Sequence, residues 1–134
     1  MKIIKVMVLI FISLLPIIIF GNRKYVELNN LAIIEGIGVE CDSNIKLYLQ
    51  EVIPIKSDAG IKYQYKYLSS EANNIDNAFI KIKKNNKKTI YTNKVKYIVT
   101  NCKSSKKVRN YFKINNITIY HNKNVLAKLK EIIN

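Results

Sequence analysis

The sequence has few of the residues from which an active site or a metal site is built. Its 134 residues include one histidine, His121, and two cysteines, Cys41 and Cys102. A four-ligand zinc site made of cysteine and histidine alone is therefore excluded. The acidic residues are scattered, and the four glycines form no phosphate-binding loop. We expect no catalytic residue, no cofactor and no metal, and therefore a protein that is not an enzyme, with His121 as a surface residue.

Arginine is almost absent, although the chain is strongly basic. The formal charge is +14, from 23 basic and 9 acidic residues, but only Arg23 and Arg109 are arginines. Arginine is preferred where phosphates are bound in two-point contacts or bases are read. The lysines accompany many asparagines, isoleucines and tyrosines, as an AT-rich coding sequence would produce. We interpret the charge as background and expect no specific nucleic-acid partner.

The two cysteines could form one disulfide. They are widely separated in the sequence, however, and no other feature of the chain marks a disulfide scaffold. We therefore favour two free thiols at Cys41 and Cys102.

An apolar leader occupies residues 1–21. Lys2 and Lys5 precede the uncharged stretch Val6 to Phe20, which predicts export or membrane insertion. As a helix, this stretch would span about 24 Å, slightly less than the roughly 30 Å hydrocarbon core. Only one of the two small residues that signal peptidase requires is present, Gly21. A cleaved signal peptide and an uncleaved anchor both remain open, and residues 22–134 form the single domain that follows.

Within that domain, hydrophobic periodicity predicts an α+β fold, a mixed β-sheet with helices packed on it. The predicted strands are Leu31 to Glu40, Ile45 to Ile53, Ile61 to Tyr67, Thr89 to Thr100 and Ile117 to Tyr120. The predicted helices begin at the N-caps Asn74 and Ser105, and a third helix, from Val125 to Ile133, closes the chain. The lysines from Lys81 to Lys88 are interpreted as a helix end followed by a loop.

The strand Ile61 to Tyr67 alternates strictly between aliphatic or aromatic and polar residues. Its tyrosines could stack on the bases of single-stranded nucleic acid while its lysines hold phosphates. A half-buried strand with a lysine-rich outer face explains the same pattern without any ligand. We favour the half-buried strand.

Two glycines, Gly36 and Gly38, interrupt the apolar strand Leu31 to Glu40. Glycine weakens a strand interior, so a local requirement must favour it here. Because the two residues are two apart, they share one face of the strand. That face is expected to carry a bulge or the close crossing of another element.

The stretch from Gly21 to Glu40 resembles the start of the mature N-terminal domain of the Ger(x)C family, the lipoprotein C subunits of spore germinant receptors. The family pattern G-C-W-D-x-R-E-I-x-x-L-A-I-V-x-G-I-G-I-D aligns with it without gaps. The matched motif positions are Glu27, Leu28, Leu31, Gly36, Gly38 and Glu40. The resemblance implies a non-catalytic component of a germinant receptor that acts by protein–protein contact at the outer face of the spore inner membrane. The implied partners are the A- and B-type receptor subunits and the membrane.

This chain also departs from the family pattern. Asn22 occupies the position of the lipobox cysteine, so thioether lipidation is chemically impossible there, and the following Trp-Asp is Arg23-Lys24. A family histidine corresponds to Lys94, and family members continue through two further domains beyond Asn134. The alternative to the receptor assignment is a basic exported module that binds anionic polymer or lipid headgroups.

Overall fold

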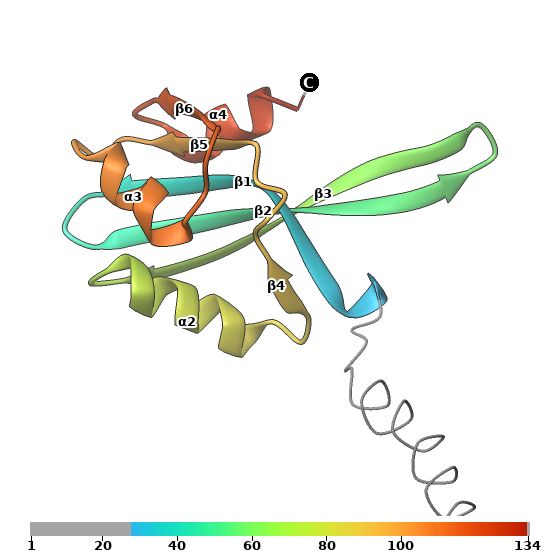
Figure 1. Ribbon diagram of the computed structural model, residues 1–134, viewed down its shortest axis with the longest axis horizontal. Helices are drawn as coiled ribbons and strands as arrows, with labels where there is room; N and C mark the ends of the chain where they lie inside the picture. The colour runs from blue at the N-terminus through green and yellow to red at the C-terminus, as the bar shows by residue number, and fades with distance from the viewer. Residues whose placement is uncertain (1–27, 134) are drawn as a thin grey trace, which may run out of the picture.

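A computed structural model describes residues 28–133 (Figure 1). The leader, residues 1–21, lies outside the described residues. The elements in chain order are the 3-10 helix η1 (Leu28–Asn30), β1 (Leu31–Cys41), β2 (Ile45–Ser57), β3 (Gly60–Ala72), α2 (Ile75–Asn85), β4 (Thr89–Tyr91), β5 (Tyr97–Thr100), α3 (Ser105–Phe112), β6 (Thr118–His121) and α4 (Val125–Glu131).

The strands form one mixed six-stranded sheet in the order β3-β2-β1-β5-β6. β1, β2 and β3 are antiparallel neighbours, whereas β5 runs parallel to β1 and β6 parallel to β5. β4 pairs in parallel with the beginning of β1, so β4 and β5 follow one another along the same edge of that strand. The expected α+β fold is confirmed, but the single strand predicted from Thr89 to Thr100 is two short strands. They are separated where β1 carries a bulge.

The bulge in β1 lies at Glu35. Ile34 pairs with Glu51 of β2, but Gly36 pairs with the preceding residue, Gln50, so Glu35 has no partner of its own on β2. The extra residue shifts the inward-facing positions from even to odd numbers along the strand. As a result Ala32, Ile34, Ile37 and Val39 all face the same side of the sheet and join one core. The bulge that the glycines led us to expect is confirmed.

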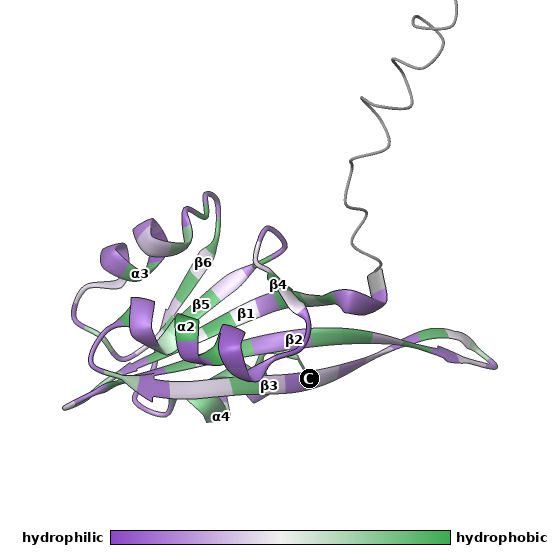
Figure 2. Cartoon of the chain, turned by 90° about the horizontal axis from the view of Figure 1, so that it is seen from below, coloured by the Kyte–Doolittle hydropathy of each residue, from purple (hydrophilic) through white to green (hydrophobic). Residues whose placement is uncertain are grey.

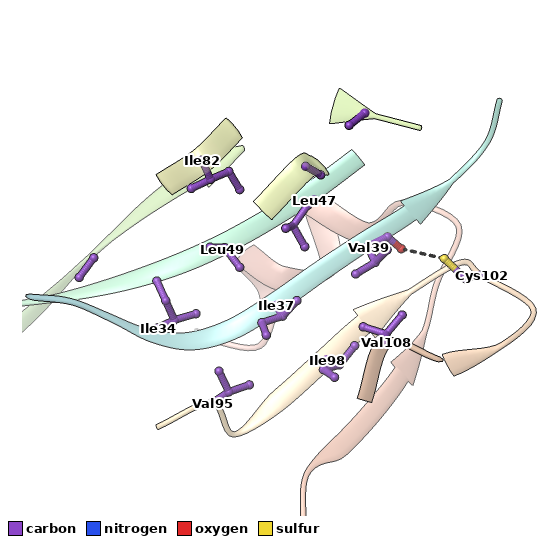
Figure 3. Packing of buried hydrophobic residues seen from close by; sticks show 13 residues of the cluster. Ile34, Ile37, Val39, Leu47, Leu49, Ile82, Val95, Ile98, Cys102 and Val108 are labelled. Atoms are coloured by element: carbon purple, nitrogen blue, oxygen red, sulfur yellow. Dashed lines mark hydrogen bonds between the residues drawn. The ribbon is translucent and has the colours of Figure 1, made fainter. Parts of the chain in front are cut away.

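The main core lies between the sheet and the helices α2 and α3 (Figure 2). Ile34, Ile37, Leu47, Leu49 and Ile98 of the sheet are fully buried there. They pack among buried residues from both helices, Ala78, Ile82 and Val108, as Figure 3 shows for the labelled residues. This side of the sheet is called the α2 face below.

Helix α4 covers the opposite side of the sheet, the α4 face, through Val125 and Leu129. A Cβ added to Gly38 would lie 2.5 Å from Leu129 Cδ1 and 2.7 Å from Val125 Cγ1. One added to Gly36 would lie 2.5 Å from the Tyr97 ring and 2.7 Å from Gln50 Oε1. Both glycines therefore let a neighbour approach the strand more closely than any side chain would allow, which confirms the expected close crossing.

The helix ends follow the sequence closely. The Asn74 side chain accepts a hydrogen bond from the backbone N–H of Asn77 at 2.8 Å and so caps α2 as predicted. Asn124 caps α4 in the same way, through the N–H of Ala127 at 3.1 Å. The cap predicted at Ser105 is wrong by one residue. Ser105 is the first residue of α3, and Ser104 precedes it without a side-chain capping bond.

The two cysteines form a disulfide, so the expectation of two free thiols is wrong. β1 and β5 pair in parallel with a constant offset, Gly36 opposite Tyr97 and Val39 opposite Thr100. Continuing this register places Cys41 opposite Cys102, and their Cα atoms are 5.1 Å apart. The pairing depends on a long-range register that sequence spacing does not reveal.

β2 and β3 extend well beyond the rest of the sheet (Figure 1). Pairing of β1 with β2 begins at Ile33 and Val52, whereas β2 and β3 remain paired out to Ser57 and Gly60. We call residues 53–64 the arm. β2 was predicted to end at Ile53, but it continues through Pro54. Proline is tolerated there because β2 no longer has β1 as a neighbour and is an edge strand on that side.

Candidate functional site

The arm exposes large hydrophobic side chains. Ile61 is 68% exposed, Tyr63 62% and Ile55 43%. Ile61 and Tyr63 project from the α4 face, whereas Ile55, which pairs with Lys62, projects from the other face. Figure 2 shows hydrophobic residues continuing along the arm away from the helices. A two-stranded ribbon with apolar residues on both faces is typical of a surface that another molecule covers.

The half-buried strand predicted for Ile61 to Tyr67 is therefore only partly confirmed. The alternation is as expected, and Tyr65 and Tyr67 are half-buried near the body of the domain. Ile61 and Tyr63 are exposed, because no helix of residues 28–133 covers the α4 face along the arm. An alternating pattern is the same whether its apolar face is covered or free, so the sequence could not distinguish the two.

A groove lies where the arm joins the body, on the α4 face, with a volume of about 350 Å³. Ile33 and Val52, which pair across β1 and β2, contribute its aliphatic part. Tyr63 and Tyr65 contribute aromatic rings from β3. The groove is thus largely apolar and continuous with the exposed face of the arm.

The charged residues at the groove are Glu35, Lys94 and Lys96. Glu35 is the bulged residue of β1, and its carbonyl accepts the backbone N–H of Lys96 at 2.8 Å. The Lys96 ammonium also forms an ion pair with the Glu35 carboxylate. Lys94 has no ion-pair partner within residues 28–133. The groove therefore presents one uncompensated positive charge beside an apolar surface.

Burial and the Glu35 carboxylate raise the pKa of Tyr65, so its hydroxyl stays protonated. Hydrogen bonding of Lys96 to Glu35 raises the pKa of that lysine and keeps it charged. Glu35 therefore interacts with Tyr65 on one side of the groove and with Lys96 on the other. This arrangement fixes charge and hydrogen-bonding groups at the rim and leaves the apolar part of the groove open.

A buried polar network lies beneath α4, in the body of the domain. Gln50 is fully buried and donates from Nε2 to the Tyr67 hydroxyl at 3.0 Å, while the Tyr97 hydroxyl donates to Gln50 Oε1. Burial raises the pKa of Tyr97 well above its usual range. The network joins β2, β3 and β5 beneath α4, so the base of the arm is held to the body by specific bonds as well as by packing.

The residues of the sequence motif lie mainly in β1, and they support the fold more than they line the groove. Leu28 begins η1 and Leu31 begins β1, while Glu27 lies outside the described residues. Gly36 and Gly38 lie on the α4 face, where Gly36 adjoins Tyr97 and Gly38 adjoins α4. Glu40 is half-buried, and its carboxylate accepts a hydrogen bond from the Tyr48 hydroxyl at 3.0 Å.

Sequence reasoning missed the groove and the exposed arm. The bulge at Glu35, which brings its carboxylate to the groove, was expected from the glycines but not placed at a residue. Pro54 was the signal that could have marked the arm, because proline favours a strand without a neighbour on one side. Lys94 was singled out only as a departure from a family pattern.

Within residues 28–133, no cluster of His, Cys, Asp and Glu is arranged to hold a metal ion. No helix in this part of the chain is long and apolar enough to cross a membrane. His121 is exposed at the end of β6.

Comparison with known proteins identifies the family. Residues 24–116 match the family model described as the spore germination protein N-terminal domain. Searches of curated proteins and of solved structures found no match. The matched residues include β1 with its two glycines, the whole arm, α2 and the residues that line the groove. The chain therefore belongs to the family of spore germination protein N-terminal domains, the family of the Ger(x)C germinant receptor subunits.

Proposed function

We propose that this protein is a non-catalytic, membrane-associated component of a spore germinant receptor that acts through contacts with the A- and B-type subunits. Family membership supports a role in spore germination. In this proposal the domain lies at the outer face of the spore inner membrane, attached through the stretch Val6 to Phe20 and not through lipid. Asn22 supports the latter point, because an amide side chain cannot form the thioether of a lipoprotein.

The disulfide supports the proposed location. Disulfides persist in oxidising compartments outside the cytosol and are rare within it. Cys41 ends β1, and Cys102 follows the end of the neighbouring strand β5, so the bond is part of the folded domain. A domain that folds with this bond is suited to the outer side of a membrane.

The observation that carries the proposal is the arm. Ile55 and Ile61 are exposed on opposite faces of a ribbon that projects from the body. Exposed apolar side chains contribute nothing to the free energy of folding. A partner that covers them on both faces of the ribbon would remove this apolar surface from water and so stabilise the complex. We infer that the arm inserts between surfaces of one or more receptor subunits.

The test is co-purification of the full chain with co-expressed A- and B-type subunits. The variant Ile55→Ser/Ile61→Ser should fold like the wild type, because both side chains are exposed, and should lose most of the captured subunit. Ile80→Ser is the matched control, since Ile80 is 46% exposed on α2. It should capture the subunits as the wild type does. Failure of the wild type to capture either subunit would contradict the proposed function.

A further inference from the structure

We propose that the groove at the base of the arm binds an acidic, apolar segment of a partner protein, with an apolar side chain seated against Tyr63 and Tyr65 and a carboxylate at Lys94. This inference rests on the proposed function, because it specifies the chemistry of the segment that the arm meets. It concerns a different set of residues from the arm's tip.

The shape and lining of the groove favour an inserted side chain. Its volume of about 350 Å³ exceeds that of any single side chain, and Ile33, Val52 and Tyr65 are all half-buried around it. Tyrosine rings offer large, rigid contact area at a low cost in side-chain entropy. An aliphatic or aromatic side chain of a partner would remove this surface from water without displacing any element of the fold.

The charges at the rim determine which segment fits. Glu35 is already paired with Lys96, so it does not attract a second cation. Lys94 is exposed and has no ion-pair partner in the described part of the chain. Lys56, which pairs with Ile61 farther out on the arm, adds positive charge on the same face as the groove. A carboxylate beside the inserted apolar residue is therefore favoured, and a lysine in that position is disfavoured.

A lipid surface carries the same negative charge but differs in shape. A bilayer surface is broad and is best contacted by a convex or flat apolar face, whereas this site is hollowed between the arm and the segment that leads from β4 to β5. Asp58, at the turn that ends the arm, would also meet anionic headgroups unfavourably. The observations therefore favour a protein segment.

The test measures fluorescence anisotropy of a short labelled peptide of alternating phenylalanine and glutamate with the full chain in neutral detergent at physiological salt. We expect saturable binding of this peptide and at least about tenfold weaker binding of matched peptides with glutamine or lysine in place of glutamate. Lys94→Glu should weaken binding of the glutamate peptide about tenfold or more and strengthen that of the lysine peptide. Tyr63→Ser should weaken binding of all three peptides.

Two variants far from the groove serve as controls. Lys84→Glu makes the same change of charge on α2, and Ile80→Ser removes a comparable exposed apolar side chain from that helix. Neither should alter binding by more than about twofold. If Lys84→Glu weakens binding as much as Lys94→Glu does, the peptide follows the overall charge and the proposal is overturned. Absence of saturable binding to the wild type overturns it as well.

A competition measurement distinguishes a protein segment from a lipid as the occupant of the groove. If micelles containing phosphatidylglycerol displace the glutamate peptide from the wild type, the groove takes lipid headgroups and the proposal is overturned. Subunit capture by the wild type separates this inference from the proposed function. Captured subunits without peptide binding contradict the groove site alone, and peptide binding without captured subunits contradicts the receptor assignment alone.

Discussion

At the scale of single residues, Gly38 lies directly under α4, with the side chains of Val125 and Leu129 in the space that its own Cβ would fill. Gly38→Val should therefore lower the free energy of unfolding by about 1–3 kcal/mol, through overpacking and strain. Urea unfolding of the full chain in neutral detergent measures the loss. Lys46→Val, an exposed position on the neighbouring strand, should change it by no more than about 0.5 kcal/mol. A Gly38→Val variant as stable as the wild type would show that α4 does not pack closely there.

Tyr48 gives the domain a defined sensitivity to alkaline pH. Burial, together with the Glu40 carboxylate, raises the pKa of Tyr48 from 10.0 to about 12. Because the folded state holds this proton more tightly than the unfolded state, the stabilising contribution is complete below about pH 10 and is lost as the pH rises towards 12.

Tyr48→Phe removes this proton and the hydrogen bond to Glu40. We expect a loss of about 0.5–1.5 kcal/mol at neutral pH and a less steep decline of stability between about pH 10 and pH 12 than in the wild type. Urea unfolding at a series of pH values compares the two. Since Tyr65, Tyr97 and Tyr111 are present in both proteins, parallel declines would contradict a contribution from Tyr48.

At the scale of elements, local signals in the sequence predicted far more than long-range ones did. Asn74 and the periodicity after it place α2 within one residue, because capping and amphipathicity are local properties. The glycines of β1 predicted a bulge and a close crossing, but not that Glu35 is bulged or that α4 is the crossing element. Those details depend on parallel pairing with β5, which is formed by residues about sixty positions later in the chain.

The disulfide connects two elements whose pairing is entirely non-local. It closes a loop with a sequence separation of 61 residues, and loop-closure entropy alone suggests a contribution of roughly 4 kcal/mol. We expect the double variant Cys41→Ala/Cys102→Ala to unfold with a free energy about 2–5 kcal/mol lower than that of the wild type. A thiol reductant should lower the stability of the wild type and leave the double variant unchanged. Equal stability of the two proteins under oxidising conditions would contradict a structural role for this bond.

At the scale of the whole molecule, the positive charge is poorly compensated. The formal charge is +14, and residues 28–133 contain three ion pairs, Lys88–Glu51, Lys96–Glu35 and Lys128–Glu131. Much of the lysine surface is thus free to attract polyanions without any shaped site. This property is separate from the groove, where Lys94 stands beside apolar and aromatic residues. Charge alone and charge combined with shape make different predictions for nucleic acid.

We expect any binding of nucleic acid to be weak, independent of sequence and lost between about 50 and about 200 mM salt, because counterion release then supplies the affinity. Fluorescence anisotropy with two unrelated duplexes and one single strand measures this at each salt concentration. Tyr63→Ser tests the alternative in which the tyrosines of β3 stack on bases. In that case the variant should bind the single strand more weakly, since a stacked base contributes about 1–3 kcal/mol. If that variant binds the single strand as the wild type does, attraction by charge is sufficient. Two results would contradict our interpretation of the charge as background. One is a loss of about tenfold or more in the affinity of Tyr63→Ser for the single strand, and the other is selective binding of one duplex at physiological salt. Attraction by charge alone requires neither an aromatic ring nor a particular sequence.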